Sequence, residues 1–405
     1  MGQLSHIRVL DLSRVLAGPW AGQILADLGA DVIKVERPGA GDDTRGWGPP
    51  FLRDRTGAET GEAGYYLAVN RGKRSVTVSL DKPEGQEIIR ELAARSDIVL
   101  ENFKAGTLAR YHLGYEDLKA VNPKIIYCSV TGFGQDGPRR DQAAYDFMIQ
   151  AMGGLMSITG ERDGKPGGGP QKVGLPIVDL MSGMYAAVSV LAALAGREAT
   201  GRGVLIDVAM LDVMVATLSN QAMNYLISGN TPQRTGNAHP NIQPQDVFAC
   251  SDGTMAVAVG NDGQFAKFCE VLGMPELSVE ARFAKNASRV RNLDALRPLI
   301  DARLREKTRH EWVSALDIAG VPAGPINTIP EVFEDPQVKF RGMVGESPHP
   351  LSGTVPRIGT PMRFDAVPGT QTRSPPLLGE HNLEVFRELG FTDDKLAGLR
   401  GRGVI

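Results

Sequence analysis

One carboxylate in the sequence stands where an acid could act on an acyl group. Asp179 follows the segment LPIV at 175–178 and precedes an apolar run that ends near Gly196. Free N–H groups and the helix dipole stabilise a carboxylate at the start of a helix. Such an ionised carboxylate can attack an acyl carbon and form a covalent intermediate. Asp179 also has the position of an ordinary acid in a first helical turn, so this feature by itself leaves both interpretations open.

The common catalytic and metal-binding motifs are missing from the sequence. The six histidines form no H-x-x-x-H pair, and Cys128, Cys250 and Cys269 are far apart along the chain. We therefore expect no metal site and no disulfide framework. No G-x-S-x-G elbow and no G-x-x-x-x-G-K-[ST] loop occurs either.

The first strand–helix–strand unit could bind a phosphorylated ligand. Strands are predicted over Ile7–Leu12 and Asp31–Glu36, with a helix over Pro19–Leu28 between them. The turn at 13–19 lacks G-x-G-x-x-G, which disfavours a dinucleotide even though Glu36 has the position of a ribose-binding acid. Backbone N–H groups at the start of the helix could still hold a phosphate.

The elements that follow predict the fold class. Further strands are predicted over Ser75–Leu80, Asp97–Leu100 and Lys124–Val130, and an amphipathic helix over Pro83–Arg95. Strands separated by helices form a parallel sheet that is covered on both faces. The sequence therefore predicts an α/β protein with a large doubly wound parallel sheet, whose ligands lie at the carboxyl ends of the strands.

Length, charge and the apolar stretches of the sequence indicate a protein of two or three domains that binds neither nucleic acid nor a membrane. A chain of 405 residues corresponds to two or three domains, and a formal net charge of -3 leaves no basic excess for binding nucleic acid. The N-terminus has Arg8, Asp11 and Arg14 where a signal peptide needs an apolar core. The stretch 175–196 has the length of a membrane span. We expect it to be a buried core helix, in a cytoplasmic protein with no membrane contact.

Changes in composition divide the chain into segments. We expect a large domain at 1–200, a linker helix and loop at 201–244, a small α+β domain at 245–321, a returning linker at 322–380, and a C-terminal segment at 381–405 that packs on the large domain. The stretch from Pro322 to Pro376 is rich in Pro and Gly and has little periodicity. Because so long a structureless stretch is unusual inside one domain, we expect it to wrap over a partner subunit.

A series of motifs along the whole chain resembles the class III CoA-transferases, a family that also contains formyl-CoA transferase and α-methylacyl-CoA racemase. The order and spacing of these motifs make the resemblance specific. They include VLDLSRVLAGP at 9–19, NRGKRSV at 70–76, DIVLENFKAGTLARYHLGYEDL at 97–118, IYCSVTGFGQDGP at 126–138, ATGRGVLIDVAMLD at 199–212 and PLLGEHN at 376–382. The resemblance implies a Rossmann-like CoA-binding domain, a small α/β domain, long linkers and two chains interlaced as rings in a homodimer.

The resemblance assigns the chemistry to Asp179, which matches the catalytic aspartate of the transferases. Its carboxylate would attack an acyl-CoA thioester to form a mixed anhydride, and the released CoA thiolate would then form an aspartyl-CoA thioester. An acceptor carboxylate would attack next and leave with CoA. The implied substrates are an acyl-CoA and a small carboxylic acid, with no permanently bound cofactor.

A second position separates the branches of this family. Racemases resemble Gly-His-Asp where this chain has Ala144, Tyr145 and Asp146. A tyrosine hydroxyl ionises only near pH 10 and is a poor base at neutral pH, so transfer is favoured over racemisation. Asp146 is expected to be either an auxiliary acid of the site or an ordinary acid at a helix start. A third reading, an acyl-CoA-binding protein without turnover, is disfavoured by Asp179.

The resemblance also implies where CoA is bound. The matching positions are Val15, Leu16, Ala17, Arg37, Lys73, Arg74, Asn102, Phe103 and Arg110. Arg and Lys suit the phosphates of CoA.

The resemblance also bears on the acceptor. Formyl-CoA transferase has a glycine-rich insertion where this chain has GNAHPNIQP at 236–244, which disfavours formyl–oxalate exchange. Within this segment, His239 and Asn241 are candidate contacts of the acceptor. The region 145–187 resembles the branch that uses succinyl-CoA and other dicarboxylates, and Arg45 is a candidate partner for a second carboxylate.

Overall fold

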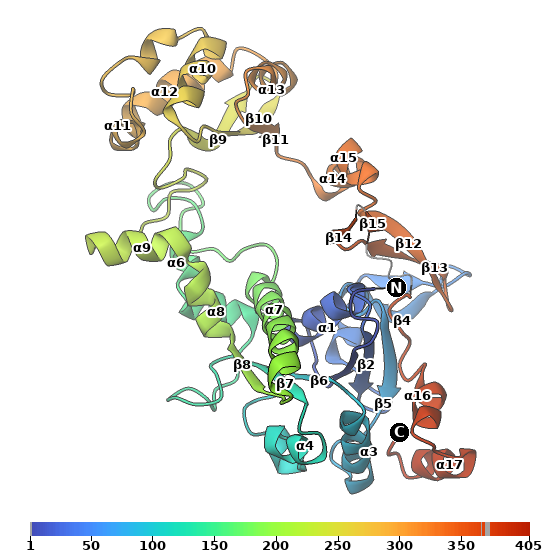
Figure 1. Cartoon of the computed structure of the whole chain (residues 1–405). Helices are drawn as coiled ribbons and strands as arrows, with labels where there is room; N and C mark the ends of the chain where they lie inside the picture. Colours follow the sequence, from blue (N-terminus) through green and yellow to red (C-terminus); the bar gives the residue numbers. More distant parts are fainter. Residues whose placement is uncertain (1, 366, 369–372) are drawn as a thin grey trace. The chain divides into compact units, whose positions relative to one another are not determined.

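Six parallel strands form the central sheet of the protein, which a computed structural model describes over residues 2–365, 367–368 and 373–405 (Figure 1). Across the sheet the strands follow the order β5 (Lys73–Thr77), β2 (Asp31–Glu36), β1 (Arg8–Asp11), β6 (Ile98–Glu101), β7 (Ile126–Thr131) and β8 (Leu205–Ala209). Every neighbouring pair is parallel. Apart from the edge strand β8 the strands are almost entirely buried, as strands between two helical layers must be. The predicted α/β class with a parallel central sheet is confirmed.

The direction in which the chain adds strands reverses between β1 and β6. The chain first adds β2 and β5 on one side of β1 and then β6, β7 and β8 on the other side. Ligands of doubly wound sheets bind in the crevice at this point. The Asn102 side chain ties the two flanking loops together: its Nδ2 donates to the carbonyl oxygen of Arg14 at 2.6 Å, and its Oδ1 accepts from the Arg14 N–H at 2.7 Å.

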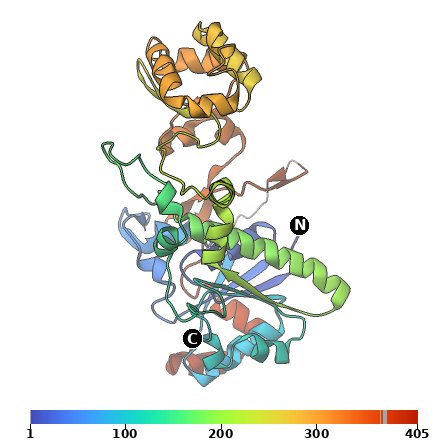
Figure 2. The ribbon, with the colours of Figure 1, turned by 90° about the vertical axis from the view of Figure 1, so that its left-hand side faces the viewer.

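Helices cover both faces of the sheet (Figure 2). One core contains apolar residues of the strands, of α3 (Pro83–Ala94) and α4 (Tyr115–Val121), and of the C-terminal helices α16 (Asn382–Glu388) and α17 (Asp393–Gly401). The other face carries α1 (Ala17–Asp27) and α7 (Ile177–Thr200). These two helices pack closely because Gly183 has no side chain: a Cβ there would lie 2.6 Å from the carbonyl oxygen of Ala17.

Helix α7 is buried on one side only. Its inward face includes Val178, Ser182, Ala186 and Val190, whereas Met184, Tyr185 and Val188 are 44%, 43% and 58% exposed. Among the described residues it is the one helix that is long and apolar enough to cross a membrane, a test that core helices of soluble proteins also pass. The expected burial therefore applies to one face of this helix, and its other apolar face is open.

The chain divides into two compact units. The first comprises residues up to Gly154, Val173–Ala222 and Gln337–Ile405, and the second comprises Leu155–Lys172 and Met223–Pro336. These bounds differ from the expected segments. Part of the expected linker at 201–244 belongs to the first unit because α8 (Met210–Thr217) packs against α7 and against α5 (Asp146–Met152).

The second unit has its own sheet and core. Its antiparallel strands are β9 (Gln245–Cys250), β10 (Gly253–Ala258) and β11 (Ala323–Pro325). Its main helices are α10 (Asp262–Leu272), α11 (Asn286–Arg291), α12 (Leu293–Leu304) and α13 (Arg309–Ile318). Phe248, Phe265 and Trp312 are buried in this core, and the Trp312 Nε1 donates to the carbonyl oxygen of Leu304 at 2.8 Å.

Two parts of the chain contain more regular structure than the sequence predicts. The segment 322–376 holds the helices α14 (Ile329–Glu334) and α15 (Pro336–Phe340) and the strand pairs β12 (Val344–His349) with β13 (Gly353–Ile358) and β14 (Arg363–Phe364) with β15 (Val367–Pro368). Residues 366 and 369–372 of this segment lie outside the described ranges. The elements β3 (Phe51–Arg53), β4 (Glu59–Ala63) and α2 (Gly64–Leu67) were also not predicted. These short elements contain Gly, Pro or charged residues and lack the alternation from which strands are predicted.

Candidate active site

Asp179 lies in the first turn of α7 and lines a cavity of about 210 Å³. The end of β7 and the loops after β1, β6 and β7 form most of the remaining wall, with Val15–Ala17, Asn102–Ala105, Val130–Gly132 and Gln142–Tyr145, and Asp43 and Met210 complete it. The cavity therefore opens at the carboxyl ends of the strands, where the topology of the sheet predicts a ligand. Within the first unit the fold brings together Asp179, Tyr145 and the predicted residues of the loops after β1 and β6.

Burial is the main influence on the Asp179 carboxyl group. Only 9% of the residue is exposed, and burial, followed by the nearby charge of Asp146, raises the pKa of Asp179 to about 7. A carboxylate that is poorly solvated is a better nucleophile than one in water. Near neutral pH the Asp179 carboxyl group is thus divided between its protonated and its ionised form.

Asp146 lies beside Asp179 but does not line the cavity. Its Oδ2 accepts from the backbone N–H of Val178 at 2.7 Å and of Asp179 at 3.3 Å, and its Oδ1 accepts from the Nε2 of Gln150 at 2.5 Å. Asp146 therefore caps the first turn of α7 from the neighbouring helix α5. Because Asp146 does not line the cavity, its expected auxiliary acid role stays a prediction.

Two tyrosines flank the carboxylates. Tyr145 lines the cavity at the start of α5 and is 62% exposed. Tyr65, on α2, was not singled out in the sequence. Burial, followed by the charges of Asp179 and Asp146, raises the pKa of Tyr65 to about 12, so its hydroxyl stays protonated and available as a donor. Its ring packs edge-on against Trp47 at 5.1 Å.

The loop after β1 is held by buried charge. Val15 has a φ of 68°, which is rare for a β-branched residue, and its N–H is shared by the two oxygens of Asp42 at 3.2 and 3.3 Å. The Lys34 ammonium lies 2.8 Å from Asp42. Although burial acts in the opposite direction, Lys34 and hydrogen bonds from Thr44 lower the pKa of Asp42 to about 2. This arrangement presents the start of α1, which no side chain caps at Leu16, to the cavity.

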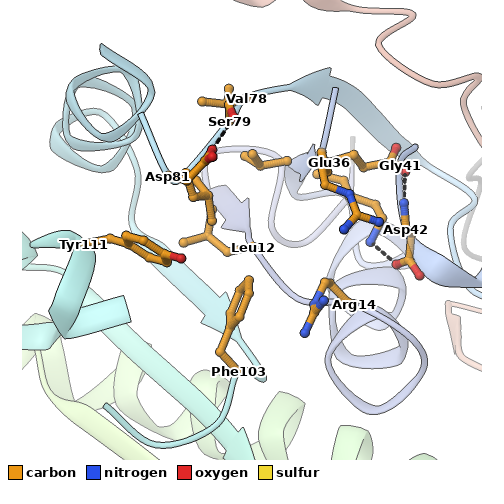
Figure 3. A pocket seen from close by; sticks show the side chains of 14 residues that line it. Leu12, Arg14, Glu36, Gly41, Asp42, Val78, Ser79, Asp81, Phe103 and Tyr111 are labelled. Atoms are coloured by element: carbon orange, nitrogen blue, oxygen red, sulfur yellow. Dashed lines mark hydrogen bonds and ion pairs between the residues drawn. The ribbon is translucent and has the colours of Figure 1, made fainter. Parts of the chain in front are cut away.

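A second cavity, of about 330 Å³, lies at the carboxyl ends of β1, β2 and β5 (Figure 3). Arg14 and Phe103 line both cavities, and the Arg14 guanidinium stacks over the Phe103 ring at 4.7 Å. Arg37 also lines the second cavity. Asp43 is the ion-pair partner of both arginines, at 3.7 Å from Arg14 and 3.6 Å from Arg37. Both pairs are long and exposed, so each guanidinium can take another partner.

Lys73 and Arg74 line neither cavity, and their charges are already paired inside the fold, so the geometry does not favour the CoA contacts expected for them. The Lys73 ammonium is fully buried and donates to Asp11, Asn70 and the carbonyl oxygen of Pro19, each at 2.9 Å. Its pKa is lowered to about 8 by burial. Arg74 is ion-paired with Asp31, Glu384 and Glu388 at the amino end of the sheet. Both cations hold the fold together.

Arg45 does not provide a free cation for a second carboxylate. Its guanidinium is bound by Glu36 at 2.8 Å and by Glu62 at 3.1 Å, and it stacks over Tyr66 at 3.7 Å. Arg110 is exposed and lines neither cavity, although its neighbour Tyr111 lines the second one. The cations that do line the Asp179 cavity are Arg14, Lys104 and Arg140. The pair Arg139-Arg140 directly after the motif at 126–138 was the only sequence signal for the last of these.

His239 and Asn241 belong to the second unit. The Asn241 side chain exchanges amide hydrogen bonds with Asn224 at 3.0 and 3.1 Å, and its backbone N–H donates to the Nδ1 of His239 at 3.1 Å. Their predicted contact with an acceptor stays a prediction. Within the described residues, no group of three His, Cys, Asp or Glu side chains could hold a metal ion.

A buried carboxylate at the carboxyl edge of a doubly wound sheet, next to an arginine-lined cavity, is the arrangement of a group-transfer enzyme with an anionic substrate. The model of CoA-transferase family III matches residues 4–382, and the chain belongs to this family. It is a CoA-transferase, and the resemblance seen in the sequence is confirmed.

Relatives with named activities cover nearly the whole chain. The succinate–glutarate CoA-transferase of Agrobacterium fabrum is 48% identical over 95% of each chain. The human succinyl-CoA:glutarate CoA-transferase is 43% identical over 99% of this chain and 90% of that protein. The succinyl-CoA:mesaconate CoA-transferase of Haloarcula marismortui is 40% identical over 96% of this chain and 97% of that protein.

Solved structures agree with the fold. The crystal structure of a CAIB/BAIF family protein from Brucella suis has a TM-score of 0.83 and 48% sequence identity, and covers 96% of this chain and 99% of that one. The crystal structure of a Mycobacterium tuberculosis protein has a TM-score of 0.81 and 34% sequence identity, and covers 94% of this chain and 98% of that one.

Proposed function

We propose that this enzyme transfers CoA from succinyl-CoA to a second dicarboxylic acid of the glutarate class, with Asp179 as the nucleophile. The observation that carries the proposal is the buried carboxylate of Asp179 in a cavity at the carboxyl edge of the sheet. The three relatives described above are named as transferases of CoA between dicarboxylates, and these names support the choice of substrates.

The reaction divides into two symmetric halves. A carboxylate oxygen of Asp179 attacks the thioester carbon, the C–S bond breaks and CoA leaves as a thiolate. The thiolate then attacks the Asp179 Cγ, the anhydride C–O bond breaks, and succinate leaves from an aspartyl-CoA thioester. The acceptor carboxylate attacks the same Cγ and displaces the thiolate, which finally attacks the acceptor's acyl carbon and releases Asp179. No net proton, electron or phosphate is exchanged, so each half only exchanges acyl derivatives.

The first turn of α1 is suited to stabilise the oxyanions of these steps. Leu16 and Ala17 line the cavity, and the first N–H groups of a helix have no intrahelical acceptor. The N–H groups in the first turn of α7 are less suitable, because Asp146 already accepts from Val178 and Asp179. Donors of this kind contribute about 3 kcal/mol each to stabilisation of a developing oxyanion.

The two cavities support a pose for CoA. The thioester must reach Asp179, so the nucleotide would occupy the neighbouring cavity, with its phosphates near Arg14 and Arg37. The proposed contacts are therefore Arg14, Val15, Leu16, Ala17, Arg37, Asn102 and Phe103. Lys73 and Arg74 are left out because their charges are neutralised inside the fold.

Lys104 and Arg140 are suited to hold the second carboxylate of a dicarboxylic acid. Both line the Asp179 cavity and both are exposed. The Arg140 guanidinium lies over Gly106, where a Cβ would be 4.0 Å from its Nη2. A guanidinium binds a carboxylate through two parallel hydrogen bonds, which gives selectivity for the charge as well as affinity.

Open apolar helix faces support an assembly of two chains. Phe147 and Met148 on α5 are 58% and 45% exposed, and Val188 on α7 is 58% exposed. Contiguous apolar surface on a folded unit usually marks an interface. We therefore retain the interlaced homodimer as part of the proposal; the cytoplasmic location stays a prediction.

An exchange experiment tests the proposal. Succinyl-CoA and glutarate labelled with ¹⁸O in one carboxylate should give glutaryl-CoA, and mass spectrometry should find the label in succinate and in the peptide that contains Asp179. The Asp179→Ala variant should lose exchange and still bind CoA. Exchange without label in that peptide would overturn the mechanism. Deuterium uptake at the α-carbon without an acid acceptor would instead support a racemase, and binding of CoA with neither reaction would support a protein without turnover.

A further inference from the structure

We propose that Asp146 and Gln150 are positioning residues for Asp179, an inference that rests on the proposed function. Gln150 holds the Asp146 carboxylate in place, and that carboxylate holds the first turn of α7, from which Asp179 reaches the cavity. Neither Asp146 nor Gln150 lines the cavity, so both act on the nucleophile through its helix.

The contacts form a chain of hydrogen bonds between α5 and α7. The Gln150 side chain is fully buried, its Oε1 accepts from the Val173 N–H at 2.9 Å, and its Nε2 donates to the Asp146 Oδ1 at 2.5 Å. The Asp146 Oδ2 then accepts from Val178 and Asp179. Gln150 therefore also holds Val173, near the start of the segment that leads into α7.

The pattern of donors and acceptors fixes the chemistry of both side chains. Asp146 accepts on both oxygens, which a carboxylate can do and an amide cannot. The Gln150 amide must donate through its Nε2 to Asp146 and accept through its Oε1 from the N–H of Val173. An asparagine at position 146 would place its own N–H donor opposite the Nε2 donor of Gln150, and this hydrogen bond would be lost. Rotation of the Gln150 amide would restore that bond but would place the Nε2 donor opposite the N–H of Val173, so the second hydrogen bond would be lost instead.

The same arrangement keeps a negative charge beside the nucleophile. Burial, and then the charge of Asp146, raises the pKa of Asp179. Burial, and then the charges of both carboxylates, also raises the pKa of Tyr65 on α2. The other charged or titratable side chains around the cavity are Arg14, Asp43, Lys104, Arg140 and Tyr145. Among these neighbours, Asp146 is the anion that reaches the α7 backbone next to Asp179.

Single substitutions should reduce the rate more than the binding of substrate. For Asp146→Asn and for Gln150→Leu we expect kcat to fall by roughly tenfold or more, because small displacements of a nucleophile reduce rates steeply. KM for succinyl-CoA should change by less than about threefold, because the determinants of CoA binding are untouched. In Asp146→Asn, the rise of kcat/KM on the acidic side of the pH profile should also move to lower pH by roughly half a unit. The reason is that the negative charge of Asp146, which disfavours ionisation of Asp179, has been removed.

A double exchange provides the rescue. In Asp146→Asn combined with Gln150→Glu, the new amide can donate to the new carboxylate and still accept from Val178, while the new carboxylate accepts from Val173. All of these hydrogen bonds are thus restored. Only the bond between residues 146 and 150 has its donor and acceptor exchanged. We expect kcat of the double variant to exceed that of both single variants and to lie within about threefold of wild type.

Gln23 provides a matched control. It is also a fully buried glutamine of the first unit that accepts from one backbone N–H, of Arg71 at 3.1 Å, and donates to one carbonyl, of Ala68 at 3.2 Å. Gln23→Leu should lower the unfolding temperature about as much as Gln150→Leu and leave the pH profile of activity unchanged. Equal kinetic losses in these two variants would show a merely structural role and overturn the inference.

The remaining outcomes separate this inference from the proposed function. Transfer by the wild-type enzyme without recovery in the double variant would overturn the positioning role alone. No transfer by the wild-type enzyme from succinyl-CoA to any dicarboxylate would overturn the proposed function, and the positioning role with it. Recovery of kcat together with return of the acidic limb towards its wild-type position would support both.

Discussion

Replacement of Asp179 by Asn should make the protein more stable while it removes the activity. Burial, and then the charge of Asp146, raises the pKa of Asp179 from its ordinary value of 3.8 to about 7. The folded protein therefore keeps a proton between these values that the unfolded chain has lost, and stability falls as the pH rises through that window. A difference of about 3 units corresponds to about 4 kcal/mol at 1.36 kcal/mol per unit. This is an upper value, because local rearrangement and water relieve part of the cost of burying a charge.

The assay is chemical denaturation of the wild-type protein and of Asp179→Asn at pH 5 and at pH 8. We expect the variant to gain between about 1 and 4 kcal/mol relative to wild type at pH 8 and much less at pH 5, where Asp179 is protonated in the folded protein. Comparison of the two proteins at each pH removes the contributions of all other titrating groups. A variant that is no more stable at pH 8, or a difference that does not depend on pH, would refute the reasoning.

Four further predictions follow from the described contacts. The kcat/KM for succinyl-CoA should rise with pH up to about 7 and then level off, because only ionised Asp179 is nucleophilic; a flat profile between pH 5 and 8 would exclude it as the titrating nucleophile. Lys73→Met should lower the free energy of unfolding by about 3 kcal/mol or more, since it leaves Asp11 buried without its partner; unchanged stability together with a raised KM for CoA esters would restore Lys73 to the CoA site. Arg37→Gln should raise KM for succinyl-CoA several-fold and leave a succinyl-pantetheine thioester nearly unaffected, whereas equal effects on both donors would remove Arg37 from the phosphate site. Sedimentation at micromolar concentration should give a dimer, and a single species at the monomer mass of 43.4 kDa would contradict the assembly.

Much of the fold was predictable because it depends on local pattern. The alternation of apolar strands with amphipathic helices in the first 130 residues predicts a parallel sheet, and β1, β2, α3, β6 and β7 lie within a few residues of the predicted positions. The segment 322–376 was poorly predicted because its hairpins and short helices have no strong periodicity. The outward face of α7 could not be predicted either, since an apolar helix reads the same whether one face or all of it is buried.

The sequence by itself determined the family and the candidate carboxylate, because both depend on residue types and on their order along the chain. Asp179 stands out as the acid at the start of an apolar helix, and the order of the motifs identifies a CoA-transferase. Only the tertiary structure decided which cations are free. Lys73, Arg74 and Arg45 look like Arg37 in the sequence, yet their partners Asp11, Glu388 and Glu62 come from other elements and neutralise them. A cation binds a substrate readily only if the fold leaves its charge free, and that depends on distances between elements far apart along the chain, which a linear sequence does not contain.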